Sequence, residues 1–169
     1  MLDAIAKRYS CRAYSDKPVD DALIDEIVTA GLRAPSAVNR RPWHIVVVTD
    51  DALRGQLAQV HAYAGFCAQA PVVFVIGAEP APTDDAWIED CSALVENMLL
   101  QAAELGLATC WVGLRGNDTM GYETEARARK VLGIPESVRL LAQIPCGHAA
   151  EPGQTKPAGP MESVHRNGW

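Results

Sequence analysis

The amino-acid sequence predicts a single domain, residues 1–169, that contains both helices and strands. A chain of this length can bury a proper core in one domain. The continuous apolar run 71–77 is typical of a central strand that is covered on both faces. Apolar residues at three- and four-residue spacing between Asp84 and Leu105 predict one long core helix. The sequence shows no internal repeat and no sign of a second domain.

Composition and charge exclude several classes of function. Hydrophobic residues make up 49% and charged residues 21% of the chain, which is ordinary for a soluble globular protein. The formal net charge of −6 gives a nucleic-acid-binding role no electrostatic basis. No apolar run is long enough to span a bilayer, and residues 1–8 do not continue into a signal peptide. We therefore expect neither nucleic acid nor a membrane as a partner.

The five cysteines and four histidines are scattered along the chain. An odd number of widely spaced cysteines without a Cys-x-x-Cys pair favours reduced thiols in the cytoplasm, and it argues against a disulfide framework or a zinc site. The histidines show no metal-ligand spacing. We therefore expect a cytoplasmic protein without a bound metal.

The N-terminal part is expected to form two helices. Residues 2–8 predict a short helix, and residues 8–14 follow as a loop or a short extended piece. Asp20 or Asp21 can cap the second helix. The apolar stripe of that helix consists of Leu23, Ile24, Ile27, Val28 and Leu32.

The middle of the chain continues with a loop and a strand that runs through about residue 48. Asp50 can cap a helix over roughly 51–60, and residues 61–69 indicate another helical piece. The central strand and a stiff surface connection over 79–83 then precede the long helix.

The C-terminal part is expected to add two strands, one helix and a tail. Gly106 ends the long helix, and residues 108–114 predict a third strand. A helix over 123–132 precedes a fourth strand over 138–144. From Pro145 onward the periodicity is lost, so an extended tail is expected, with apolar residues near its end that need a docking surface.

The charges of the helix 123–132 follow a regular pattern. Glu123 and Arg127, like Glu125 and Arg129, are four residues apart, and apolar positions are few. We interpret these charges as a solvated helix face.

Arg8, Ser10 and Arg12 alternate in the N-terminal extended piece. An extended backbone would place all three side chains on one face. Two guanidinium groups around a hydroxyl suit a phosphate, because arginine offers paired donors in a planar fork. Local positive charge in an acidic protein indicates a small anion. The residues alone leave open whether this face is a phosphate site or a solvated charged edge.

The loop over residues 34–43 is a second candidate site. Pro35 and Pro42 stiffen its ends, and between them are a hydroxyl, an amide and two guanidinium groups. Binding residues often gather on such loops between rigid elements. A plain polar connection remains the alternative.

Other familiar chemistry is missing from the sequence. It has no Gly-x-Gly-x-x-Gly after a strand, no phosphate-loop lysine motif and no Gly-x-Ser-x-Gly elbow. A Ser–His–Asp set cannot be assembled from it. If the protein is an enzyme, a cofactor is expected to carry the chemistry.

Several segments resemble one known family. Residues 8–12, Arg-Tyr-Ser-Cys-Arg, resemble the Arg-x-Ser-x-Arg/Lys signature that opens the flavin-dependent nitroreductase family. Residues 35–43, Pro-Ser-Ala-Val-Asn-Arg-Arg-Pro-Trp, resemble its Pro-Ser-x-x-Asn-x-Gln-Pro-Trp loop. Residues 105–113 are similar to its Leu-Gly-Leu-x-(Ser/Thr)-x-Trp-x-Gly segment, and 132–135 and, more loosely, 147–152 match later landmarks. The resemblance covers nearly the whole chain in the right order.

The resemblance implies an α+β fold, a nitroreductase-like three-layer sandwich in which helices flank a mixed, mainly antiparallel sheet. It also implies an intertwined homodimer with FMN at the interface, and residues 150–169 as an extended tail over the partner subunit. NADH or NADPH would be the electron donor. The flavin N5 would carry the chemistry, without a catalytic side chain.

The resemblance also assigns the cofactor contacts. The first group comprises Arg8, Tyr9, Ser10 and Arg12, and its arginines and serine would hold the FMN phosphate and neighbouring polar groups. The second comprises Pro35, Ser36, Ala37 and Asn39, which would contact the flavin across the dimer, with Asn39 at the pyrimidine edge. The third comprises Trp111, Val112 and Gly113, near the dimethylbenzene and N5 side.

Three departures from the family pattern affect these expectations. Arg41 stands where the family usually has glutamine; it would either stabilise the anionic reduced flavin or point to solvent. Lys156 would have to replace an arginine that many relatives carry near Ala158. The chain also lacks the long insertion of larger members, so an open flavin face and loose specificity are expected.

The implied function is an FMN-dependent NAD(P)H oxidoreductase that passes electrons, by a ping-pong route, to small planar electron-poor acceptors such as nitroaromatics or quinones. The alternative is an FMN-binding protein without NAD(P)H turnover, in a sensor, carrier or accessory role. A specialised branch, such as flavin destruction or reductive dehalogenation, is a third reading. In a fourth, the arginine clusters are structural and bind carboxylates of a partner.

Overall fold

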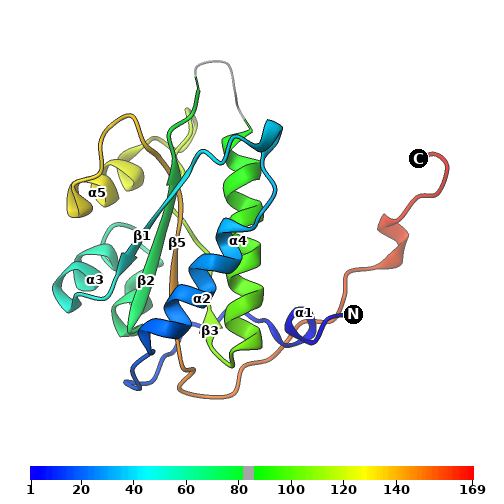
Figure 1. The fold of residues 1–169 in the computed structure, drawn as a ribbon, viewed down its shortest axis with the longest axis horizontal. Helices are drawn as coiled ribbons and strands as arrows, with labels where there is room; N and C mark the ends of the chain where they lie inside the picture. The colour runs from blue at the N-terminus through cyan, green and yellow to red at the C-terminus, as the bar shows by residue number, and fades with distance from the viewer. Residues whose placement is uncertain (82–85) are drawn as a thin grey trace.

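One antiparallel sheet organises the computed structural model, which describes residues 1–81 and 86–169 (Figure 1). The strand order is β1-β2-β5-β3, and β4 also pairs with β5. The strands are β1 (Trp43–Val48), β2 (Val72–Ala78), β3 (Ala108–Thr109), β4 (Val112–Gly113) and β5 (Arg139–Gly147). All pairs between these strands are antiparallel. The predicted mixed character is limited, in the described residues, to a parallel bridge between Ser10 and Thr109.

Helices cover both faces of the sheet, as predicted for a three-layer α+β sandwich (Figure 1). They are α1 (Asp3–Lys7), α2 (Asp21–Leu32), α3 (Asp51–Leu57), α4 (Trp87–Glu104) and α5 (Glu123–Leu132). Strand β2 is buried along its whole length, which confirms the predicted central strand. Its alternate side chains, Phe74 and Val75 for example, belong to separate cores. One core lies against α2 and α4, and the other against α3 and α5.

Helix α4 is the long core helix that the apolar spacing predicts. It packs closely on α2, where a Cβ added to Gly31 would come within 2.7 Å of Met98 Cγ. Gly106 follows its last turn with a φ of 73°, a conformation that glycine adopts without strain. The predicted helix start at Asp84 and the end of the predicted connection 79–83 lie outside the described residues.

The predicted strand 108–114 is divided into β3 and β4, and β5 is longer than predicted. Ala108 and Thr109 pair with the end of β5, which therefore extends to Gly147. Pro145 was expected to begin the tail, but it lies within β5. Proline has no N–H to donate to the sheet, but its carbonyl oxygen accepts the Cys110 N–H at 3.3 Å.

Two expectations for α2 need correction. Leu32 is 46% exposed and does not belong to the buried stripe, where Gly31 lies instead. Asp20 occupies the N-cap position, but its side chain makes no capping hydrogen bond.

Between β1 and β2, the first predicted helix begins where the sequence indicates, but the helical segments are shorter than predicted. Asp50 caps α3 as predicted, with Oδ1 accepting the Leu53 N–H at 2.9 Å. The helix ends at Leu57 rather than near residue 60. The predicted helical piece 61–69 is reduced to a 3-10 helix, Gly65–Gln69.

The tail leaves the body of the molecule, as Figure 1 shows. Its described side chains from residue 150 on are exposed, including Val164 and Trp169, and a 3-10 turn, Met161–Ser163, is its one regular element. The described part of this single chain therefore does not cover Val164 and Trp169, for which the sequence predicts a docking surface. None of the helices in the described residues combines the length and apolarity needed to cross a membrane.

Candidate functional site

The segment around Ser10 lies along β3. Ser10 forms a parallel bridge with Thr109, and the Cys11 N–H donates to the Thr109 carbonyl oxygen at 2.9 Å. Arg8 leaves α1 in an extended conformation, with φ −61° and ψ 133°. The backbone is therefore extended where the alternating pattern requires it.

Three side chains of this segment, Arg8, Ser10 and Arg12, act on the buried thiol of Cys110. Burial raises the pKa of that thiol, whereas the Arg12 guanidinium, the Ser10 hydroxyl and the Arg8 guanidinium lower it in part. The Arg12 guanidinium also donates to the Ser10 carbonyl oxygen at 3.4 Å, so Arg12 lies beside Ser10, and Arg8 is near enough to act on the same thiol. Ser10 and Arg12 are exposed and Arg8 is half-buried, so an anion can reach them from solvent. We call these three residues the arginine cluster.

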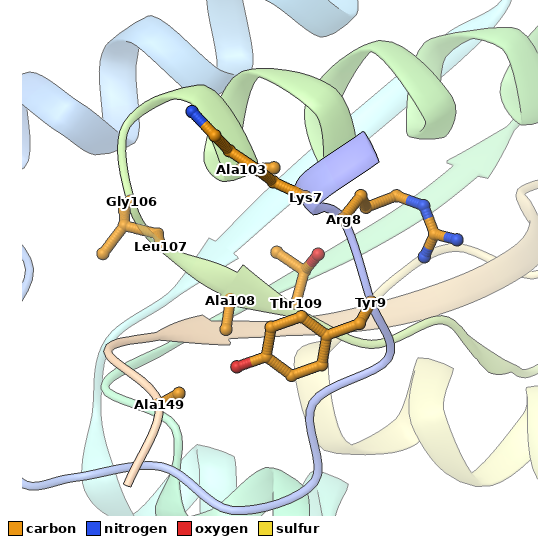
Figure 2. A pocket seen from close by; sticks show the side chains of 9 residues that line it. All are labelled: Lys7, Arg8, Tyr9, Ala103, Gly106, Leu107, Ala108, Thr109 and Ala149. Carbon is orange, nitrogen blue, oxygen red and sulfur yellow. The ribbon is translucent and has the colours of Figure 1, made fainter. Parts of the chain in front are cut away.

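A pocket of about 210 Å³ borders the arginine cluster at the C-terminal end of α4 (Figure 2). Figure 2 shows the charged ends of Lys7 and Arg8 pointing away from each other, with the Tyr9 ring beside Thr109. The tail crosses this ring closely, because a Cβ on Gly153 would come within 1.8 Å of it. Tyr9 is thus held between the tail and the sheet.

The floor beneath the arginine cluster is apolar and rich in thiols. The Tyr14 hydroxyl lies 3.0 Å from the Cys11 carbonyl oxygen and 3.1 Å from that of Pro145. Burial, followed by the neighbouring thiols, raises the pKa of Tyr14 far above its usual range. The thiols around it belong to Cys11, Cys67, Cys110 and Cys146. All five cysteines of the chain are free and buried.

The loop over residues 36–41, which we call the amide loop, has an unusual backbone. Val38, Asn39 and Arg41 have φ values of 46°, 57° and 53°. Residues other than glycine rarely adopt this left-handed backbone conformation, and β-branched residues such as valine adopt it least readily. Such backbone strain persists only where surrounding contacts hold it, and it is common at functional sites.

Hydrogen bonds to side chains, together with backbone bonds from Asn39 to Ser36 and from Arg40 to Ala37, hold the amide loop. The Arg41 N–H donates to Ser36 Oγ at 2.9 Å, and Arg41 Nε donates to Asn39 Oδ1 at 3.0 Å. The Ala37 N–H donates to Oδ1 of Asp90, on α4, at 2.8 Å. The Arg41 side chain therefore folds back onto the amide oxygen of Asn39, an exposed residue.

The arginine cluster and the amide loop lie at opposite ends of α4 (Figure 1). Asp90, which holds the loop, is in the first turns of the helix, whereas Thr109 follows its last turn. At a rise of 1.5 Å per residue the helical part of this separation alone is about 20 Å. One chain does not bring the two groups together.

The remaining predicted site residues are divided in the same way. Trp111, Val112 and Gly113 follow Thr109 beside β5, so they lie in the part of the chain that carries the arginine cluster. Trp111 is 38% exposed. Pro35 is exposed and adjoins the amide loop. Lys156 lies on the exposed tail.

Sequence reasoning missed two buried carboxylates, Asp90 and Glu125. Asp90 is 4% exposed, and its spacing from Trp87 and Leu94 places it within the apolar stripe of α4. The sequence did contain a signal for the burial of Asp90, because a charged residue there has the same spacing as the apolar residues of the helix. Glu125 is fully buried, so the predicted solvated face of α5 is wrong at this position. No such signal marked Glu125, because its main partner, Arg139, comes from β5.

The fold is α+β, and the arginine cluster places two guanidinium groups and a hydroxyl on its surface. The sequence matches the Nitroreductase family over residues 5–62 and 56–148. A provisionally named NADH dehydrogenase/NAD(P)H nitroreductase of Methanothermobacter thermautotrophicus is 34% identical, over 100% of this chain and 87% of that protein. The chain therefore belongs to the nitroreductase family, as its motifs indicate, and it is an oxidoreductase.

Solved structures agree with this assignment. The structure of an FMN-dependent nitroreductase from Clostridium difficile matches with a TM-score of 0.91 and 31% identity, over 100% of both chains. The structure of a provisionally named NADH dehydrogenase/NAD(P)H nitroreductase from Bacteroides thetaiotaomicron matches with a TM-score of 0.92 and 32% identity, over 99% of this chain and 96% of that one. The predicted nitroreductase-like fold is confirmed.

Proposed function

We propose that the protein is an FMN-dependent NAD(P)H oxidoreductase that reduces small, planar, electron-poor acceptors. The observation that carries this proposal is the exposed arginine cluster, in which the Arg12 guanidinium lies 3.4 Å from the Ser10 carbonyl oxygen and Arg8 acts on the same Cys110 thiol as Arg12. Such a cluster suits a phosphate monoester, because it offers paired charged donors. The relatives named for FMN and NAD(P)H support the choice of cofactor and electron donor.

The chain's residues fit FMN at both ends of the cofactor. Arg8, Ser10 and Arg12 would hold the phosphate. The amide loop would hold the ring, because the exposed side-chain amide of Asn39 carries N–H donors that match carbonyl and ring-nitrogen acceptors. When bound, FMN would accept two electrons from NADH or NADPH and pass them on to the acceptor.

The separation of the two groups supports a site shared between two chains. Helix α4 stands between the arginine cluster and the amide loop of one chain. A homodimer in which the cluster of one subunit faces the loop of the other would complete the site. The exposed tail, with Val164 and Trp169, would then cover the partner subunit.

The residues proposed around the ring bind and orient, and none is assigned a proton transfer. Trp111 would offer an exposed aromatic face beside the site. Flat acceptors such as nitroaromatics or quinones suit such a site, because they can stack on the ring from which the electrons leave.

The first expected result is a flavin absorption spectrum in freshly purified protein. Adding NADH or NADPH without oxygen should bleach it, and a quinone or nitroaromatic should restore it. Stopped-flow absorbance at the flavin bands measures both steps. A flavin that neither nucleotide bleaches would replace this proposal with FMN binding without turnover. A protein that refuses added FMN would overturn both.

A second expected result concerns Arg41. Its guanidinium lies beside Asn39, so it would stabilise negative charge on the reduced ring. Arg41→Gln should therefore make the midpoint potential of the bound flavin more negative, whereas Arg41→Lys should largely keep it. Dye-equilibration titration measures the potential. An unchanged potential in Arg41→Gln would mean that the side chain does not act on the ring.

A further inference from the structure

We infer that Asp90 is the positioning residue of the amide loop, and that it sets the affinity of the ring end of the cofactor without touching the cofactor. This inference rests on the proposed function. The juxtaposition behind it is a buried carboxylate on α4 that accepts a backbone N–H of the loop, from a residue 53 positions away in the sequence.

Asp90 occupies a position that packing alone would give to an apolar residue. It belongs to the buried stripe of α4, between Trp87 and Leu94. A buried carboxylate is costly unless it is hydrogen-bonded. Oδ1 accepts the Ala37 N–H at 2.8 Å, but Oδ2 is buried without a hydrogen-bond partner among the described residues. The core therefore tolerates an unsatisfied oxygen at this point.

The Asp90 carboxylate holds the part of the amide loop whose backbone is strained. Ala37 immediately precedes Val38 and Asn39, both left-handed. The Asn39 N–H and the Arg41 N–H bond within the loop, to the Ser36 carbonyl oxygen and the Ser36 hydroxyl. The bond from Ala37 to Asp90 ties this local assembly to the rigid helix. Without it, the strained conformation loses its anchor, and Asn39 loses its fixed direction.

Helix geometry makes Asp90 a good anchor. It lies in the first turns of α4, where the helix dipole favours a negative side chain. Ser36 is extended, with φ −139° and ψ 155°, so the chain arrives from α2 in a conformation that aims the Ala37 N–H at the helix. Affinity is gained because the loop is ordered before the ligand arrives.

The test compares FMN with riboflavin, which lacks the phosphate. Asp90→Ala should weaken both ligands by the same factor, roughly 10- to 100-fold, the worth of one hydrogen bond to a charged group. Asp90→Asn keeps the acceptor oxygen and should stay within a few-fold of wild type. Arg12→Ala should weaken FMN alone. Glu89→Gln, which removes an exposed charge from the same helix turn, is the matched control and should change neither.

Hydrogen exchange gives a second readout that needs no ligand. The Ala37 amide should lose its protection in Asp90→Ala and keep it in Asp90→Asn. If Asp90→Ala fails to fold, Ala37→Pro removes the same hydrogen bond from the loop side, after a residue whose extended backbone suits a following proline.

The outcomes separate this inference from the proposed function. Wild-type protein that binds neither FMN nor riboflavin would overturn both. Wild-type binding with unchanged riboflavin affinity in Asp90→Ala, or in Ala37→Pro where Asp90→Ala does not fold, would overturn the positioning role alone. So would a loss in Asp90→Asn as large as in Asp90→Ala, because the acceptor oxygen would then not be what matters.

Discussion

Replacing Arg8 and Arg12 together by alanine should lower FMN affinity by roughly 100- to 10,000-fold. A hydrogen bond to a charged group contributes about 1.5–3 kcal/mol, and two are lost. Neither side chain belongs to the hydrophobic cores, so the melting temperature should stay close to that of wild type. Fluorescence titration measures the affinity, and raising the salt concentration should weaken wild-type binding more than that of the variant.

Two matched comparisons isolate the phosphate contact. Riboflavin affinity should be unchanged in the double variant, because riboflavin has no phosphate to lose. Arg127→Ala with Lys130→Ala removes the same charge from exposed positions on α5 and should leave FMN binding intact. Full retention of FMN in the double variant of the arginine cluster would show that these side chains do not bind the phosphate.

The same variant tests whether two chains share the site. A second variant, Ser36→Ala with Asn39→Ala, damages the amide loop while leaving the arginine cluster intact. A dimer made of one chain of each kind would have one site with both defects and one site with none. Differently tagged chains, co-expressed and purified through both tags, should therefore bind one FMN per dimer with wild-type affinity. Absence of binding would place the whole site within one chain.

Local sequence patterns predicted those elements whose apolar residues lie together within one segment of the chain. The continuous apolar run became the fully buried β2, and the three-four spacing became α4. The division of 108–114 and the end of β5 were not predictable in this way, because both depend on which residues pair. Thr109 pairs with Cys146, a partner 37 positions away, which no local pattern contains.

The candidate site shows the same limit. Alternation predicts that Arg8, Ser10 and Arg12 share a face, but the buried thiol of Cys110, on which all three act, is brought near them by the bridge from Ser10 to Thr109. The left-handed backbone of Val38 was not predictable, because valine disfavours it and distant contacts must stabilise it.

Substitution of Glu125, whose burial was not predicted from the sequence, is expected to have the largest effect on stability. Its carboxylate accepts Arg139 Nε at 2.8 Å, the Leu140 N–H at 2.7 Å and the Gly116 N–H at 3.0 Å. Arg129 adds an ion pair at 3.4 Å. One side chain therefore joins α5, β5 and the segment that follows β4.

Glu125→Ala should lower the free energy of unfolding by about 3–5 kcal/mol, the usual cost of removing one partner from a buried ion pair. The loss also leaves two backbone N–H groups without their acceptor. Glu125→Gln keeps an acceptor oxygen and should lose less. Urea denaturation measures both, with the exposed Glu123→Gln, on the same helix, as a control that should change little.

The stability difference between wild type and Glu125→Gln should also depend on pH. Burial alone would raise the pKa of Glu125, but the hydrogen bonds from Arg139, Leu140 and Gly116 outweigh it, so the pKa lies below its usual range. A depressed pKa contributes stability that is fully present above the unfolded pKa, about 4.3, and is lost as the pH falls through the folded value. The difference should therefore be constant from pH 7 to about 5.5 and shrink on further acidification. A difference that stays constant down to pH 3 would show that the carboxylate charge does not stabilise the fold.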